Sequence, residues 1–306
     1  MRDLFYDLVR RNGMPVAIYL MLAVTLWVFI LIVLPQLTMF DYSFRLNLPP
    51  GKVGGPEDVY TVEQYAYLFQ GSGGAGNINT LDLGILFKTL FSAVFVTVFD
   101  LLICYPVAFV LAKSSTGAKA RLLVLALIVP YWINEILRAF AFRILFGSTG
   151  VINEFGMGLG LWDNPVDFIR ADVALYAGLA YAYILLMIFP LYNAIESLDR
   201  NQIEAARDMG ASWWQVHAKV VIPYAKPGIA SGMTMVFMLT SGALAAPQIL
   251  GGPSNLWFTQ LVYQWFNSGG NWPRGSAYAM ILLFVCIALV LLTMRIFKVS
   301  IGEIKR

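Results

Sequence analysis

The sequence predicts an all-α integral membrane protein, on the strength of its composition and of the length of its apolar stretches. Of the 306 residues, 59% are hydrophobic and 13% are charged, whereas soluble domains carry about 25% charged residues. Six apolar stretches reach the roughly 20 residues that a helix needs to cross a bilayer. The basic residues flank these stretches rather than cover one surface, so nucleic acid is not an expected partner.

The N-terminal region predicts two different contacts with the membrane. We expect residues 1–14 to form an amphipathic interfacial helix, because Leu4, Phe5, Leu8 and Val9 recur at helical spacing among charged neighbours. The apolar run that follows is too long for the core of a signal peptide and lacks a small-residue cleavage site. It therefore predicts the first membrane span.

A polar loop follows the first span, and residues 60–69 predict a short helix within it. Five further spans complete a membrane domain over residues 15–300. Cys104 and Cys286 lie inside apolar stretches without redox or metal spacing, so we expect both to pack in the core. The predicted spans cover residues 15–40, 85–112, 122–145, 172–195, 227–250 and 276–297. Three glycines of the fifth span predict close packing against neighbouring helices: Gly228, Gly232 and Gly242.

The distribution of basic residues predicts the orientation of the spans. Loops on one side hold most of the lysines and arginines, and positive loops stay in the cytoplasm. This places both termini and residues 196–226 in the cytoplasm. The basic residues of the opposite loops are Arg45, Lys52, Arg143, Arg170 and Arg274.

Residues 196–226 form a charged segment between two spans, and local signals predict a helix at its start. Asn201 with Glu204, or Asp199 with Gln202, can form the capping box that begins this helix. Strong helix formers follow.

The second half of the same segment predicts a turn and another helix. Gly210 can end the first helix in a left-handed turn, and Ser212 can cap a second helix. We expect Pro223 to end that helix, because proline lacks the backbone donor that a helix interior needs. His217 has no second ligand at metal-binding spacing, so we expect no metal.

The spacing of this segment resembles the EAA loop of ABC importer permeases. Glu-Ala-Ala is followed by a glycine four positions after the second alanine, and the segment closes with Val220-Val221-Ile222-Pro223. The resemblance implies the type I ABC importer permease fold, with six transmembrane helices. It also implies a coupling helix that docks on a cytoplasmic ATPase subunit. The coupling residues that the resemblance implies are Glu204, Ala205, Ala206, Arg207, Asp208 and Gly210.

Other parts of the chain resemble the spermidine/putrescine-type subgroup of these permeases. The second span reads Thr89-Leu90-x-Ser92, the third reads Pro130-Tyr131-Trp132-x-Asn134-x-x-x-Arg138, and the fifth ends Pro247-Gln248-Ile249-Leu250-Gly251-Gly252. The resemblance implies import of a polyamine such as spermidine or putrescine. Permeases for opines and aminophosphonates share these features, so an opine, an aminophosphonate or an amino-acid-like solute remains an alternative substrate.

The family resemblance also implies the partners. A second permease subunit, expected as a homologue in a heterodimer, a cytoplasmic ATPase dimer and a periplasmic solute-binding protein would assemble in the bacterial inner membrane, in contact with lipid. The chain contains no GxxxxGK[ST] phosphate-binding loop. We therefore expect it to be no enzyme and to hold no cofactor, with ATP and Mg²⁺ bound by the ATPase subunits.

Charged residues within the spans suggest where a substrate passes. A charge inside a bilayer usually faces a partner or water, and aromatic faces attract ammonium groups. We therefore predict a transient site for a cation. The alternatives are that Glu135 pairs with Arg138 three residues away, that Asp100 meets the partner subunit, that Asn134 caps a kink and that Arg138 extends outward. The candidate pathway residues are Asp100, Tyr131, Trp132, Asn134, Glu135 and Arg138.

Two classes of protein compete with the importer. A stand-alone secondary transporter or channel would show internal repeats with broken helices, which the sequence does not reveal. A membrane enzyme would need clustered catalytic groups, yet the chain has one histidine and no HExxH or GxSxG motif.

Overall fold

The computed structural model describes residues 9–10, 13–71, 78–114, 118–252 and 255–298. Every regular element in these ranges is a helix, and one isolated bridge joins Arg45 to Tyr60, so the all-α prediction is confirmed. The predicted interfacial segment, residues 1–14, lies mostly outside the described residues. The chain forms two compact units, one of residues 1–79 and 262–281 and another of residues 80–261 and 282–306.

The first unit begins with one long helix that contains a π turn. Helix α2 (Met14–Val28), the π segment η1 (Phe29–Val33) and α3 (Leu34–Ser43) follow one another without a gap. Pro35 stands in the first turn of α3. A proline there has no α-helical hydrogen bond to donate, and a π turn just before it accommodates the missing bond. The short helices η2 (Pro50–Lys52) and α4 (Glu63–Gln70) follow.

Two arginines hold the polar part of the first unit together. Arg45 lies 2.7 Å from a carboxylate oxygen of Asp41 and 2.7 Å from one of Asp58. The hydrogen bond with Asp41 raises the pKa of Arg45. Arg274 stacks over the ring of Tyr67, with 3.5 Å from its guanidinium carbon to the ring centroid, and donates from Nε to Gln64 at 3.2 Å. Both guanidinium groups therefore tie segments that are distant in sequence.

The second unit is a helical bundle in which α5 (Thr80–Phe109), α9 (Val173–Glu196) and α12 (Ile222–Ser241) all pack against one another. Its apolar core includes Cys104, and Cys286 is buried in a smaller cluster, so both cysteines pack in the interior as predicted. Helix α14 (Phe258–Asn267) and helix α15 (Trp272–Phe297) each contribute residues to both units. The other elements are α5 (Thr80–Phe109), η4 (Val110–Ser114), α6 (Ala118–Ile128), η5 (Val129–Trp132), α7 (Glu135–Leu145), α8 (Val151–Gly158), α9 (Val173–Glu196), α10 (Arg200–Asp208), α11 (Trp213–Val216), η6 (His217–Val221), α12 (Ile222–Ser241) and α13 (Ala245–Leu250).

Glycine allows α9 and α12 to approach at backbone distance. A methyl group added at Gly228 would clash with the carbonyl oxygen of Pro190 and lie 2.6 Å from the Cβ of Ala194. One added at Gly232 would lie 2.8 Å from the sulfur of Met187. The close packing predicted for these two glycines is confirmed. Gly242 differs, because it caps the C-terminus of α12.

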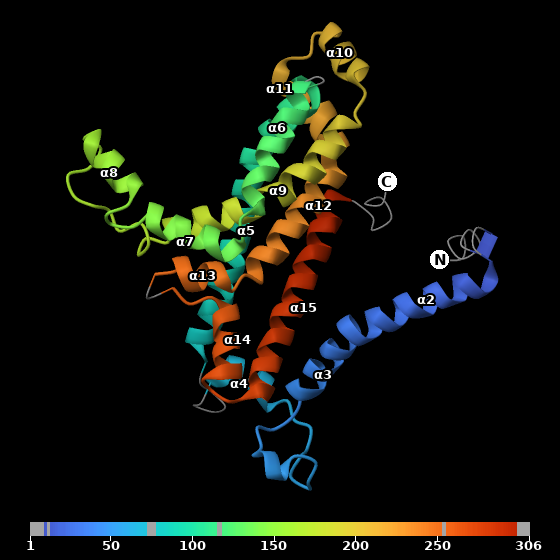
Figure 1. Ribbon diagram of the computed structural model, residues 1–306, viewed down its shortest axis with the longest axis vertical. Coiled ribbons are helices and arrows are strands. Elements are labelled where there is room, and N and C mark those ends of the chain that lie inside the picture. The colour runs from blue at the N-terminus through green and yellow to red at the C-terminus, as the bar shows by residue number, and fades with distance from the viewer. Residues whose placement is uncertain (1–8, 11–12, 72–77, 115–117, 253–254, 299–306) are drawn as a thin grey trace. The chain divides into compact units, whose positions relative to one another are not determined.

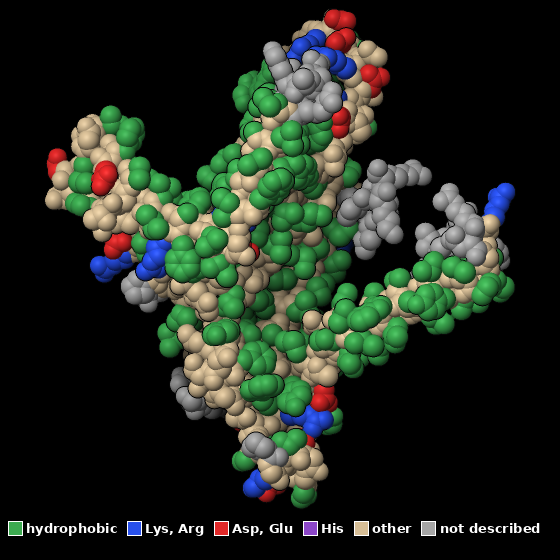
Figure 2. All heavy atoms as spheres, viewed as in Figure 1, with side chains coloured by type: hydrophobic (Ala, Val, Ile, Leu, Met, Phe, Trp, Pro, Cys, Tyr) green, Lys and Arg blue, Asp and Glu red, His purple; other side chains and the backbone are tan. Residues whose placement is uncertain are grey.

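Four described helices are long and apolar enough to cross a membrane: Met14–Ser43, Thr80–Lys113, Val173–Glu196 and Trp272–Phe297. A fifth candidate is the pair Leu122–Trp132 and Glu135–Leu145, which is bent by 91°. These helices overlap five of the predicted spans. Figure 2 shows hydrophobic side chains covering much of the visible surface of the helices, as expected where lipid replaces water.

The stretch predicted as a single fifth span differs from the prediction. Residues 227–250 divide into α12 and α13, with a break at residues 242–244. Within this break, the amide of Ala243 donates to the carbonyl of Thr240, three residues back, in place of an α-helical bond. Residues 227–250 therefore form most of one helix, α12, followed by the short separate helix α13.

Candidate coupling loop and membrane groove

Helix α10 carries the predicted coupling residues, and side-chain caps set where it begins. Asp199 is the N-cap, since its carboxylate accepts a hydrogen bond from the amide of Asn201 at 3.0 Å. The predicted box between Asn201 and Glu204 is wrong, because Asn201 already lies inside the helix. Gly210 follows the helix with φ +84°, the left-handed conformation expected of a C-terminal glycine.

Ser212 caps α11, as the sequence predicts, and Gln215 completes a capping box that was not predicted. The amide of Ser212 donates to Oε1 of Gln215 at 2.8 Å, and the amide of Gln215 donates to Oγ of Ser212 at 3.4 Å. The left-handed Gly210 and the cap at Ser212 therefore define the turn between α10 and α11. Figure 1 shows them together at one end of α9 and α12.

One face of α10 is anchored and the other is free to meet a partner. Ile203 and Ala206 are buried in the core of the second unit. Glu204 lies on the exposed side, with its side chain 62% exposed and 3.9 Å from Arg200. Met209, directly after the helix, is 83% exposed. A helix with two anchored apolar residues and an exposed charged and apolar face is suited to dock against another subunit. The predicted coupling residues divide between these faces, with Ala206 buried and the rest exposed: Glu204, Ala205, Arg207, Asp208 and Gly210.

The second helix of the loop does not end at Pro223, which corrects the prediction. Helix α11 passes into the π segment η6 and then into α12 without a break. Pro223 lies in the first turn of α12. The π turn before it changes the hydrogen-bond pattern where proline cannot donate, so the helix continues.

Four of the predicted pathway residues lie around one short segment between η5 and α7. Asn134 caps α7 by accepting from the amide of Ile136 at 2.9 Å, which confirms its predicted capping role. The guanidinium carbon of Arg138 lies 4.5 Å from the ring centroid of Tyr131. Glu135 accepts from the hydroxyl of Tyr183 at 3.4 Å.

The expected alternative roles of this segment's charges are not what the structure shows. Within the described residues, no ion pair joins Glu135 to Arg138 within 4.0 Å. Arg138 does not extend outward, because its Nε and Nη1 are buried without a hydrogen-bond partner. It also faces the ring of Tyr181, at 5.7 Å. Arg138 therefore lies over Tyr131, one of the two aromatic rings that the sequence suggested for a substrate cation, and over Tyr181, which the sequence did not suggest.

The remaining two predicted pathway residues lie in opposite environments. Asp100 is 1% exposed, and neither carboxylate oxygen has a hydrogen-bond partner among the described atoms. Trp132 is 84% exposed. Within the described part of the chain, no hydrogen bond, ion pair or ring contact joins either side chain to Glu135 or Arg138, so the structure does not bring all six predicted residues together at one site.

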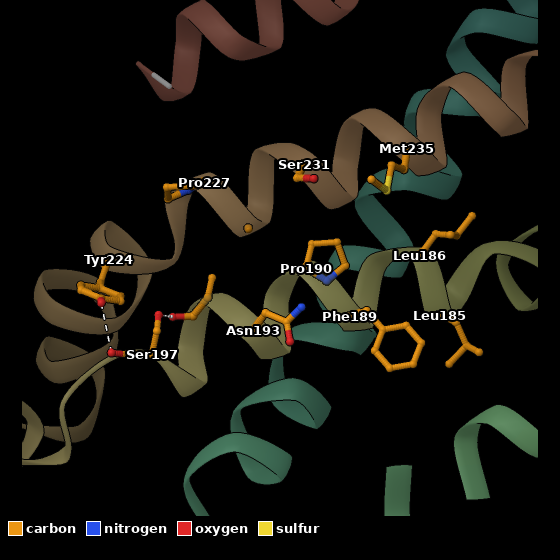
Figure 3. Close-up of a pocket in the computed structure, with 12 residues that line it drawn as sticks. Leu185, Leu186, Phe189, Pro190, Asn193, Ser197, Tyr224, Pro227, Ser231 and Met235 are labelled. Carbon is orange, nitrogen blue, oxygen red and sulfur yellow. Dashed lines mark hydrogen bonds between the residues drawn. The ribbon is translucent and has the colours of Figure 1, made fainter. Parts of the chain in front are cut away.

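A groove of about 820 Å³ runs between α9 and α12. Figure 3 shows Pro190 and Asn193 reaching from α9 toward α12, and the hydrogen bond of 3.1 Å from the hydroxyl of Tyr224 to the carbonyl of Ser197 at one end. All the lining residues are uncharged: Leu185, Leu186, Phe189, Pro190, Asn193, Ala194, Ser197, Tyr224, Pro227, Gly228, Ser231 and Met235.

The groove and the segment between η5 and α7, which contains Glu135, both contact α9 at neighbouring residues. The amide of Leu185, which lines the groove, donates to the hydroxyl of Tyr131 at 3.3 Å. The carbonyls of Tyr181 and Ala182 each lie 2.8 Å from the hydroxyl of Tyr131, and its single hydrogen is donated to one of them or shared between both. The sequence prediction missed the groove residues. Proline within α9 and near the start of α12, beside small polar residues, is the signal that could have indicated them.

The chain belongs to the family of binding-protein-dependent transport system inner membrane components, whose sequence pattern matches residues 81–300. It is thus a multi-pass inner-membrane permease subunit of an ABC importer. The chain is 32% identical to the spermidine/putrescine transport system permease protein PotB of Escherichia coli K12 over 259 residues, which cover 85% of this chain and 90% of the relative. It is 30% identical to the PotB protein of Haemophilus influenzae, covering 83% and 84% of the two chains.

Solved structures share the fold at lower sequence identity. A chain of a bacterial alginate ABC transporter, crystallised with a periplasmic protein bound to an alginate pentasaccharide, matches with a TM-score of 0.72 and 17% identity, covering 97% of this chain and 99% of that chain. A chain of the MetNI methionine ABC transporter matches with a TM-score of 0.52 and 22% identity, covering 71% and 95%. Both likenesses establish the type I permease fold.

Proposed function

We propose that this chain forms half of the membrane pathway of an ATP-driven importer for a polyamine, spermidine or putrescine. The observation that carries the substrate class is the match with PotB, at 32% identity over most of both chains. The alternatives are an opine, an aminophosphonate or an amino-acid-like solute moved by the same machinery.

The partners follow from the same proposal. A homologous second permease completes the pathway, a periplasmic solute-binding protein delivers the ligand, and both termini of this chain lie in the cytoplasm. ATP and Mg²⁺ bind to a cytoplasmic ATPase dimer, so this chain itself neither hydrolyses ATP nor holds a cofactor. The anchored face and the exposed face of α10 support its role as the coupling helix.

The groove between α9 and α12 suits the passage of a flexible solute. Its lining combines apolar side chains with the neutral polar groups of Asn193, Ser197 and Ser231. An uncharged lining gives a cation no strong partner, so the cation can move on. Glu135 is the carboxylate that adjoins this route, since it accepts a hydrogen bond from Tyr183 of α9, and it is placed to receive an ammonium group. Arg138 already covers the aromatic rings beside it.

The assembled complex tests the substrate class directly. We expect spermidine or putrescine, delivered by the binding protein, to raise ATP hydrolysis of the complex in lipid discs. Opines, aminophosphonates and amino acids form the comparison panel. Stimulation by one of these compounds and not by a polyamine would contradict the polyamine proposal and identify another substrate. Absence of an associated ATPase would favour a stand-alone transporter.

Glu135 and Asp100 make a matched pair for testing the pathway. We expect Glu135→Gln to raise the apparent KM for spermidine uptake by about tenfold, because a charge-assisted hydrogen bond contributes roughly 1.5–3 kcal/mol. Asp100→Asn should change the apparent KM less, since its carboxylate is buried away from any recorded partner. Uptake kinetics in proteoliposomes measure both. An unchanged KM for Glu135→Gln would contradict a role in substrate passage.

A further inference from the structure

Helix α5 and the π segment η4 that continues it contact both ends of the loop that carries α10. At the start of the loop, Nζ of Lys113 in η4 donates to the carbonyl of Glu196 at 3.1 Å and also to the carbonyl of Leu198. At its end, the hydroxyl of Tyr105 in α5 lies 2.6 Å from Nδ1 of His217 in η6. The loop that carries α10 is therefore attached to one span at two points.

His217 is the more enclosed of these two attachments. It is 4% exposed. Its ring centroid lies 4.1 Å from that of Trp213 and 4.5 Å from that of Phe109. Phe109 and Tyr105 are one helical turn apart on α5, so they present one face to the imidazole. Trp213 belongs to α11 and approaches from the loop side.

Aromatic contacts and a hydrogen bond restrain the two helices in different ways. Contacts between tilted rings, such as those of His217 with Trp213 and Phe109, are compatible with several geometries, whereas a hydrogen bond requires a particular distance and direction. Burial, and to a smaller extent the nearby charge of Arg207 on α10, lower the pKa of His217, which favours the neutral ring. A neutral imidazole can form this bond with one nitrogen and keep its other nitrogen for a second partner.

We propose that the hydrogen bond between Tyr105 and His217 is a latch that makes α5 move together with the coupling loop. The two residues are positioning residues for transport. The proposal rests on the proposed function, because it takes α10 to be the element that receives motion from the ATPase. According to this proposal, motion of α10 reaches α5 as well as α12, although α5 is distant from the loop in sequence.

The variants remove the bond from either side and restore it from one side. Tyr105→Phe removes the hydroxyl and His217→Phe keeps a ring without a polar atom. His217→Asn retains a polar group near the place of Nδ1. Tyr192→Phe is the control, because it removes an exposed tyrosine hydroxyl, bonded to Glu196 at 2.9 Å, from the same end of α9.

The first readout is the amount of spermidine transported per ATP hydrolysed by the complex in proteoliposomes. We expect Tyr105→Phe and His217→Phe each to lower this ratio about fivefold, because one hydrogen bond contributes about 1 kcal/mol. The double variant should lose no more than either single variant, and His217→Asn and Tyr192→Phe should keep the ratio within about twofold. A latch that only stabilised the fold would reduce the yield of complex and leave this ratio unchanged.

The second readout needs no substrate and no ATPase activity. Spin labels at Leu102→Cys on α5 and Gln202→Cys on α10 report the distance between the helices, in a background where Cys104 and Cys286 are replaced by alanine. We expect a narrow distance distribution in the chain with the native latch and a broader one with His217→Phe. Equal widths, or an unchanged transport ratio, would overturn the latch. Narrow distances without polyamine transport would instead contradict the substrate assignment alone.

Discussion

Replacing Gly228 with alanine is expected to lower the unfolding midpoint of the permease by about 6 °C, because about 3 kcal/mol of stability is lost. The added methyl group meets the backbone carbonyl of Pro190 and the Cβ of Ala194. Neither neighbour is the end of a flexible side chain, so α9 and α12 must separate. Since both helices line the groove, transport should fall with the stability.

Gly84→Ala is the matched control for this prediction. Gly84 also lies within a helix of the same unit, but an added methyl group there meets nothing within 4 Å. Alanine is favoured over glycine in a helix by about 1 kcal/mol, so Gly84→Ala should leave the midpoint unchanged or raise it. Thermal unfolding in lipid discs measures both variants. Equal midpoints for the two would show that α9 and α12 do not depend on backbone contact at Gly228.

The second large effect is expected at α10, the proposed coupling helix. Glu204→Lys should reduce spermidine-stimulated ATP hydrolysis of the complex by about 30-fold, which corresponds to a hot-spot loss of about 2 kcal/mol at an interface. The permease itself should remain folded, because the side chain of Glu204 is 62% exposed and lies 3.9 Å from Arg200. Exposed pairs of this kind contribute little to stability.

Gln202→Lys supplies the comparison on the same helix. Gln202 is also exposed, but two positions along a helix correspond to a different face. We expect this variant to keep most of the stimulated activity. Hydrolysis rates and the yield of co-purified ATPase distinguish the two lysine variants. A similar loss in both would indicate a general charge effect and contradict a specific role for Glu204.

Local signals explain which features of the loop could be predicted from the sequence. The left-handed turn at Gly210 and the capping box of Ser212 depend on residues within a few positions of one another. The helical class and five of the span positions depend on composition over about 20 residues. All the residues that determine such a feature lie within the same short segment, so the sequence of that segment is enough to predict it.

Features that depend on distant segments could not be predicted in this way. Tyr105 and His217 are 112 positions apart, and the groove needs both α9 and α12. The course of the chain through Pro223 depends on a π turn, whose extra residue leaves no mark in the hydrophobic pattern. The sequence suggests that Arg138 pairs with Glu135 or extends outward. It does not reveal that the ring of Tyr181, 43 positions later, faces the guanidinium group.

The uninterrupted helix from α11 through η6 to α12 has a consequence for the length of the chain. Each residue added to an α-helix rotates everything beyond it by about 100°. One residue inserted or deleted between Val216 and Ile222 would turn the exposed face of α10 away from its present direction, while the caps at Asp199 and Ser212 remained intact. The number of residues between the loop and α12 thus determines the direction in which the exposed face of α10 points.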